Sequence, residues 1–301
     1  MSTNPSPALT ARRIPFEFPE GMQTNWMPKD PEFAAMLNGA SLTMPYLEPF
    51  LIRTMRETLA RIDDASLQAD GEGFMAQEGQ HFRTHRRFND LLKNHGYPEL
   101  AEVEQQMEAS YARLSQRSLR TRMAYTAGFE SMTLGVTRWL VEHRVELFHG
   151  ADPRVVSFVL WHMVEETEHK CVAYDVYQAA FGTSLGSYWA RMIGVFHGSF
   201  DVMRYSMQGY RAILKKDGRW NQLRSRLRLA VRIGRFIRHV GPYLLRAALP
   251  GNSPRRERDP EWVLDWLRGY DRSAAPGVPL LDTLDPLMAV PFASTPSRDA
   301  A

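Results

Sequence analysis

Residues 159–176, which read VLWHMVEETEHKCVAYDV, decide the fold. One face of this stretch recurs at steps of three and four residues, and its members are Val159, His162, Glu166, His169, Ala173 and Val176. Such steps predict an amphipathic α-helix whose recurring face is buried. The Glu-x-x-His motif from Glu166 to His169 lies on that face. Because ionisable groups in a core are costly unless they are paired or bind a metal, the motif indicates a metal site.

A second stretch, residues 74–92, reads FMAQEGQHFRTHRRFNDLL and repeats the pattern. Its recurring face consists of Phe74, Glu78, His81, His85, Phe88 and Leu92. A Glu and a His three residues apart lie on one side of a helix, so both can bind the same metal. A third motif, Glu146 to His149, falls at a predicted helix end beside Gly150, and we interpret it as a chance occurrence.

Two further helices each offer one inward glutamate. Glu130 lies on the stripe Met123, Ala127, Glu130, Leu134, Thr137 and Val141, and Glu48 precedes Leu51, Met55 and Leu59 in the same register. One Glu from each of two helices and one Glu-x-x-His from each of two others is the ligand set of ferritin-like di-iron and di-manganese bundles. We therefore predict a two-metal catalytic site on Glu48, Glu78, His81, Glu130, Glu166 and His169.

With these motifs, the chain resembles the ferritin-like di-iron carboxylate superfamily. More narrowly, the segments LEPF (47–50), QEGQH (77–81), FE (129–130) and EETEHK (165–170) resemble a bacterial family called predicted metal-dependent hydrolases. The resemblance covers about residues 12 to 270. It implies a metal-dependent enzyme, and the word hydrolase in the family name is itself a prediction.

The predicted fold class is all-α, a ferritin-like four-helix bundle with additional C-terminal helices. Alternating strand patterns are nearly absent, and helical patterns span about 31–62, 68–94, 99–114, 118–148, 153–180, 187–216, 221–248 and 262–268. We divide the chain into an extended N-terminal arm (1–30), the metal-binding bundle (31–182), a basic helical extension packed on it (183–272) and a disordered tail (273–301).

The composition is that of a soluble globular protein, with 44% hydrophobic and 24% charged residues and a formal net charge of +3. The single cysteine, Cys171, excludes an internal disulfide and a site built on several thiolates. Carboxylate and imidazole ligands suit iron, manganese or zinc, and we expect iron. The N-terminus lacks the apolar core of a signal peptide, and no apolar stretch could span a membrane. We therefore expect a cytoplasmic protein.

The leading hypothesis for function is an oxygen-activating di-iron enzyme, an oxidoreductase that acts on a small apolar substrate and receives electrons from a donor protein. One alternative is a metal-dependent hydrolase that uses a metal-activated water, and another is a non-enzymatic iron-binding or storage protein. A homodimer is also compatible with the sequence. We expect the substrate pocket to be lined by apolar residues of 187–216, namely Trp189, Met192, Phe196, Phe200, Met203 and Met207.

Three further sets of residues are interpreted separately from the six predicted ligands. His85 and His162 occur one turn from the motifs, and each is interpreted as a further ligand, as a group that orients a ligand, or as a core histidine. Glu165 is assigned to the surface or to an orienting role. The segment 221–248 alternates arginines with apolar residues, so it either lies on the inner face of an anionic membrane or packs on the bundle with its arginines solvated. No nucleic-acid motif occurs, and we predict no nucleic-acid partner.

Overall fold

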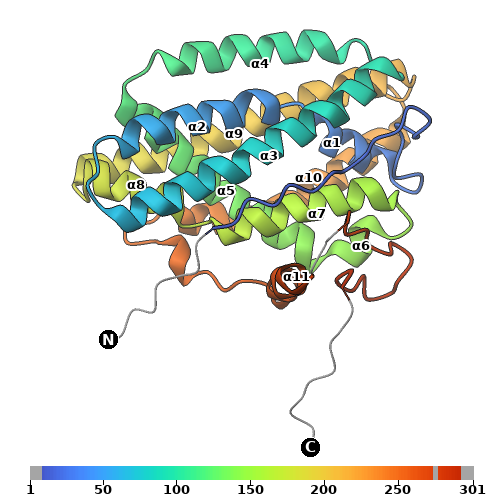
Figure 1. Ribbon diagram of the computed structural model, residues 1–301. Coiled ribbons are helices and arrows are strands. Elements are labelled where there is room, and N and C mark those ends of the chain that lie inside the picture. The colour runs from blue at the N-terminus through green and yellow to red at the C-terminus, as the bar shows by residue number, and fades with distance from the viewer. Residues whose placement is uncertain (1–8, 274–276, 293–301) are drawn as a thin grey trace, which may run out of the picture.

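A computed structural model describes residues 9–273 and 277–292, and Figure 1 shows that this part of the chain is built of helices. No strand occurs within it, so the all-α prediction is confirmed. The α-helices are α1 (Pro31–Ser41), α2 (Met44–Leu59), α3 (Ala65–Asn94), α4 (Leu100–Ser115), α5 (Leu119–Glu142), α6 (Arg144–Phe148), α7 (Pro153–Glu168), α8 (Val172–Phe181), α9 (Leu185–Lys216), α10 (Leu223–Ala247) and α11 (Glu261–Arg272). None of these helices is long and apolar enough to cross a membrane.

The helices that carry the motifs start where the sequence supplies caps. The side chain of Asp64 accepts hydrogen bonds from two backbone N–H groups at the start of α3, and Asp152 caps α7 with Pro153 in its first turn. Helix α2 runs through Pro49, which has no N–H to bond the carbonyl of Pro45. Arg86 of α3 donates to that carbonyl instead, at 3.3 Å. Glu48 thus lies in a continuous helix held against α3.

Besides the helical pattern over 31–62, which is divided at residues 42–43 into α1 and α2, two of the predicted helices are interrupted. The helix predicted over 118–148 is divided at His143 into α5 and α6, and the one predicted over 153–180 is divided at 169–171 into α7 and α8. His169 itself has a non-helical backbone, with φ −95° and ψ 8°. Neither break contains a glycine or proline, so the sequence pattern gives no sign of it. The break leaves the His169 side chain directed into the bundle, where it is fully buried.

Residues 9–30 contain no helix and run along α3 and α7 as an extended segment (Figure 1). Phe16 of this arm packs its ring on Phe158 and Trp161 of α7. Arg12 is 98% buried, since only 2% of it is exposed. The arm therefore covers one side of the bundle with both apolar and charged contacts.

The C-terminal helices pack on the outside of the bundle. Helix α9 lies along α5 and α1, and α10 lies along α5 (Figure 1). Residues 277–292 fall in the stretch predicted to be disordered, yet they pack on the bundle: Leu281 N–H donates to Ser157, and Leu281 and Met288 are buried. The prediction failed there because the segment's few apolar residues find a partner surface on α7 and α11. The remainder of the predicted tail lies outside the described residues, apart from Ser273.

Candidate metal centre

All six predicted ligands meet inside the bundle. Glu48 comes from α2, Glu78 and His81 from α3, Glu130 from α5, and Glu166 and His169 from the end of α7. None of these residues is more than 3% exposed. Four of them, Glu78, Glu130, Glu166 and His169, offer ligand atoms that all lie within 4.8 Å of one another, and Glu48, Glu78 and His81 form a second such group. The two groups share Glu78, as two neighbouring metal positions with a bridging carboxylate would.

The ligand atoms lack ordinary hydrogen-bond partners. Both carboxylate oxygens of Glu48, Glu78 and Glu130 are buried without one, as are Oε2 of Glu166, Nδ1 of His81 and Nε2 of His169. The Nε2 atom of His169 lies 3.3 to 3.4 Å from oxygens of Glu78, Glu130 and Glu166. Buried polar atoms are rarely left unpaired, because each costs free energy. Cations at the centre of this convergence would satisfy them, so the donor set fits metal ions.

Burial also changes the acidity of these carboxyl groups. It raises the pKa of Glu78 to about 8, and the nearby carboxylate of Glu166 acts in the same direction. The pKa of Glu130 is raised to about 8 for the same two reasons. The pKa of Glu48 is raised as well, first by burial and then by the charge of Glu78. Without cations, the cluster therefore retains protons at neutral pH.

Hydrogen bonds fix which nitrogen of each motif histidine faces the cluster. His81 donates from Nε2 to the carboxylate of Glu165 at 2.9 Å, which leaves Nδ1 free to bind a metal. His169 donates from Nδ1 to Oε1 of Gln77 at 2.9 Å, which leaves Nε2 free. Carboxylate or amide groups behind a ligand histidine set its tautomer and orientation in metal sites. Glu165, for which surface and orienting roles were both open, is buried and orients His81.

Arg12 holds Glu165 directly and Gln77 through Glu168. Its guanidinium donates to Glu165 at 3.2 Å and to Glu168 at 2.7 Å, and Glu168 accepts from Gln77 at 2.6 Å. One residue of the N-terminal arm thus supports His81 through Glu165 and His169 through Glu168 and Gln77. Sequence reasoning missed Arg12 and Gln77, because no helical spacing links an arginine in a Pro-rich arm to motifs on α3 and α7.

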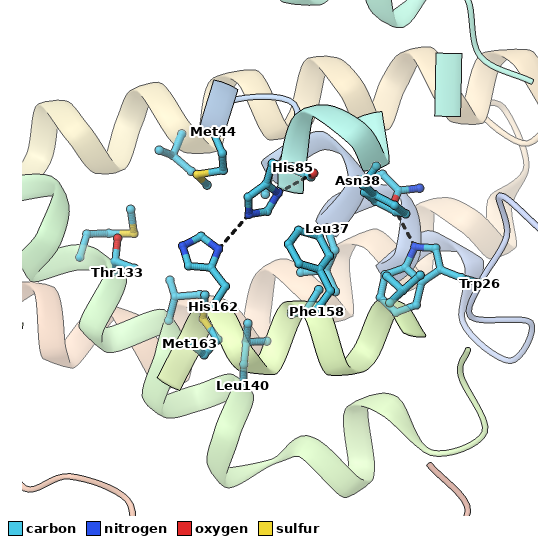
Figure 2. A pocket seen from close by; sticks show the side chains of 18 of the residues that line it. Trp26, Leu37, Asn38, Met44, His85, Thr133, Leu140, Phe158, His162 and Met163 are labelled. Atoms are coloured by element: carbon cyan, nitrogen blue, oxygen red, sulfur yellow. Dashed lines mark hydrogen bonds between the residues drawn. The ribbon is translucent and has the colours of Figure 1, made fainter. Parts of the chain in front are cut away.

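His85 and His162 extend the cluster through a second chain of hydrogen bonds. Ser41 donates to Asn89 at 2.7 Å, so its oxygen accepts from Nδ1 of His85 at 2.8 Å. Burial lowers the pKa of both histidines, so both are neutral. His85 then accepts at Nε2 from Nδ1 of His162, at 2.8 Å (Figure 2).

The remaining nitrogen of His162, Nε2, therefore carries a lone pair and lies 2.9 Å from Oε1 of Glu166. Two acceptors at this distance need a cation or a shared proton between them. The geometry thus favours His162 as a further ligand and His85 as the residue that orients it. The third motif, from Glu146 to His149, was interpreted as a chance occurrence. Its glutamate fits that interpretation, because Glu146 is 55% exposed and pairs with Arg235.

A small apolar cavity of about 110 Å³ adjoins this histidine pair (Figure 2). Its lining includes Leu37, Phe88, Met132, Leu140, Phe158 and Met163, together with His85 and His162. The prediction that α9 lines the pocket with its large apolar residues is wrong, since only Val202 of α9 contributes. Trp189, Phe196 and Phe200 lie on the outer face of α9 and are exposed, because α9 buries its glycine face against α5.

Comparison with known proteins adds one finding. The sequence model of a family described as predicted metal-dependent hydrolase matches residues 10–258. No curated protein and no solved structure matches the chain. The matched range includes Arg12, the six predicted ligands and the His85–His162 pair.

Proposed function

The chain belongs to the family of predicted metal-dependent hydrolases, and on this basis we propose that it is a hydrolase with two divalent cations in its buried cluster. The observation that supports the cations most directly is the set of buried carboxylate and imidazole atoms that converge without hydrogen-bond partners. When bound, such a pair of cations activates a water molecule and polarises a scissile carbonyl or phosphoryl group.

Each ligand has a role that follows from its place. Glu78 belongs to both groups of ligand atoms and would bridge the cations. Glu48 and Nδ1 of His81 would hold one cation, and Glu130 and Nε2 of His169 the other. Glu166 belongs to the group that contains Glu130 and His169, and it also forms a group with His162 and His81. The four glutamates carry four negative charges when ionised, which offset two divalent cations and leave the buried site neutral.

The cavity indicates the class of substrate. Its volume of about 110 Å³ is somewhat below the ~150 Å³ of an engineered cavity that binds benzene. Its lining is almost wholly apolar, so it suits a phenyl ring or a short branched alkyl group rather than a charged one. We propose that the substrate places such a group beside His85 and His162, with its reacting bond toward the ligand cluster.

A second candidate is supported by the ligand set itself. Glutamates and Glu-x-x-His motifs contributed by separate helices are the ligands of ferritin-like di-iron proteins, many of which react with oxygen. In this alternative the cluster would hold iron, and the chain would be an oxidoreductase acting on the same small apolar group. The apolar surroundings of the cavity are compatible with either reaction.

Metal analysis and two assays distinguish the candidates. The natively purified protein should contain about two metal ions per chain, and esters or phosphate esters with a small aromatic group should be cleaved under anaerobic conditions with zinc or manganese. An oxygen-activating enzyme should instead give a ferric absorption band when the ferrous protein is exposed to air, and should need a reductant for turnover.

A matched pair of variants tests the ligand assignment. Glu78→Gln removes a proposed bridging ligand, whereas Glu146→Gln changes the glutamate of the chance motif, which is exposed. We expect Glu78→Gln to lose metal and Glu146→Gln to retain it. Full metal content in both Glu78→Gln and His169→Ala would refute the proposal.

A further inference from the structure

The outer face of α10 is apolar and has no partner within the described part of the chain. Its exposed apolar side chains recur at helical spacing along and just beyond the helix, and between 55% and 74% of each is exposed. They are Leu223, Leu227, Val231, Ile237, Leu245 and Leu249. Protein surfaces rarely leave so many large apolar side chains on one helix face open to water, so the stripe indicates a surface that something else covers.

The charges around this stripe have one sign. Residues 218–256 contain no Asp or Glu, and their arginines are Arg219, Arg224, Arg226, Arg228, Arg232, Arg235, Arg238, Arg246, Arg255 and Arg256. Those that face the bundle pair with acids of other elements, such as Arg228 with Glu32. Arg224 and Arg238 are exposed and form no ion pair with any described residue. Free positive charge therefore remains beside the apolar stripe.

A groove of about 600 Å³ combines the two properties. It runs beside α10 and is lined by Lys29, Arg224, Arg228, Arg232 and Arg235, together with Leu223, Leu227 and Val231. Its one acid, Asp30, is paired with Arg232. Cations next to aliphatic side chains match the phosphate and the upper acyl chain of an anionic lipid.

Helix α9 adds apolar surface next to the end of α10. Tyr188 and Arg191 of α9 donate to the carbonyls of Ala248 and Ala247, so the first half of α9 adjoins this end. On its outer side this half of α9 exposes Leu185, Trp189, Ile193, Phe196 and Phe200. Tryptophan beside aliphatic residues is typical of the boundary between lipid and water.

We propose that the protein docks on an anionic lipid bilayer with α10 lying in the plane of the membrane surface. The apolar stripe would enter the boundary between headgroups and acyl chains, and the unpaired arginines would bind lipid phosphates. A second copy of this chain fits the α10 face poorly, since a symmetric contact would bring arginines together with no acid from 218–256 to neutralise them.

Vesicle co-sedimentation of the full chain tests the proposal. Vesicles with 30% phosphatidylglycerol in phosphatidylcholine should bind the protein in low salt, pure phosphatidylcholine vesicles should bind it much less, and ~0.5 M NaCl should release most of it. Arg224→Glu combined with Arg238→Glu should weaken partitioning about thirtyfold or more, since each arginine near the surface contributes about fivefold.

The apolar contribution has a matched control. Leu227→Ser with Val231→Ser removes two exposed aliphatic residues of the stripe, and Leu284→Ser with Leu287→Ser removes two that are as exposed but lie in the 277–292 segment. We expect only the first pair to lose vesicle binding, with metal content unchanged in both. Equal binding to neutral and anionic vesicles, equal loss in both pairs, or a dimer in solution that the first pair dissociates would overturn the proposal.

Discussion

Arg12 and His81 are bound to the same carboxylate, that of Glu165. The guanidinium lies 3.2 Å from Oε1, and Nε2 of His81 lies 2.9 Å from Oε2. The backbone N–H of Arg12 also donates to Glu165, at 3.1 Å. Arg12 also donates to Glu168, which accepts from Gln77, and Gln77 in turn accepts from His169. The orientation of both motif histidines therefore depends on one buried arginine in the N-terminal arm.

The first prediction concerns this arginine. Arg12→Gln should weaken metal binding about 10- to 100-fold, the usual cost of removing a group that orients a ligand. Arg12→Lys should restore little, because a single ammonium cannot bond Glu165 and Glu168 with the geometry of a fork. Metal titration with a chelator competitor measures the effect, and Arg13→Gln, at an exposed neighbouring position, is the control. Equal affinity in Arg12→Gln and Arg13→Gln would contradict this role.

The convergence of the six candidate ligands could be predicted because helical spacing fixes which residues share a face. His81 follows Glu78 by three residues and His169 follows Glu166 by three, and both pairs interrupt otherwise apolar stripes. Because apolar stripes are buried against one another in a helical bundle, residues on such stripes are expected to meet in its interior. The single glutamates Glu48 and Glu130 occur on stripes of the same kind. Local periodicity was sufficient for this part of the site.

The groups behind the ligands could not be predicted, because they depend on which distant segments become neighbours. Arg12 and Glu165 are 153 residues apart, and Gln77 and His169 are 92 apart. The end of α7 at His169 could not be predicted either, because no glycine or proline occurs there. The exposed outer face of α9 carries large apolar side chains, as a buried helix face would. The sequence pattern therefore led to the prediction that these side chains line a pocket.

The second prediction is a pH dependence of the metal-free protein. Burial and the charge of Glu166 raise the pKa of Glu78 and of Glu130 from 4.5 to about 8. Between these pH values the folded chain holds protons that the unfolded chain has released, so the free energy of unfolding should fall as pH rises. The upper limit is about 1.4 kcal/mol per pH unit for each group.

Metal loading should reverse this trend. Because cations replace the protons, metal binding should release protons and become tighter from pH 6 to about pH 8. Urea unfolding of the metal-free and loaded protein at both pH values measures the two effects. A metal-free protein whose stability does not fall over this range would show that the cluster retains no protons without cations.

The third prediction concerns His162, whose Nε2 faces Glu166 at 2.9 Å. His162→Ala should reduce the metal affinity or remove one metal ion per chain, because it deletes a ligand lone pair. Ser41→Ala should have a smaller effect of the same sign, since it only frees the tautomer of His85. Metal titration of both variants against a competing chelator measures which of them loses more metal affinity. If His162→Ala binds two metals as tightly as the unaltered protein, His162 is a core histidine.

The fourth prediction concerns the contact between α5 and α9, which holds Glu130 in place. A Cβ atom added to Gly194 of α9 would lie 2.0 Å from the backbone oxygen of Ala124 in α5. Gly194→Ala should therefore push the two helices apart and lower the free energy of unfolding by about 2 kcal/mol. Since Glu130 follows Ala124 on α5, metal affinity should fall as well.

Gly234 of α10 supplies the matched control for this substitution, because nothing lies within 4 Å of the Cβ that it would gain. Gly234→Ala should raise stability by up to about 1 kcal/mol, the ordinary difference between the two residues in a helix. Chemical unfolding of both variants without metal separates close packing from helix propensity. Stabilisation by both substitutions would mean that α5 and α9 are not in backbone contact, and the position of Glu130 would then need another support.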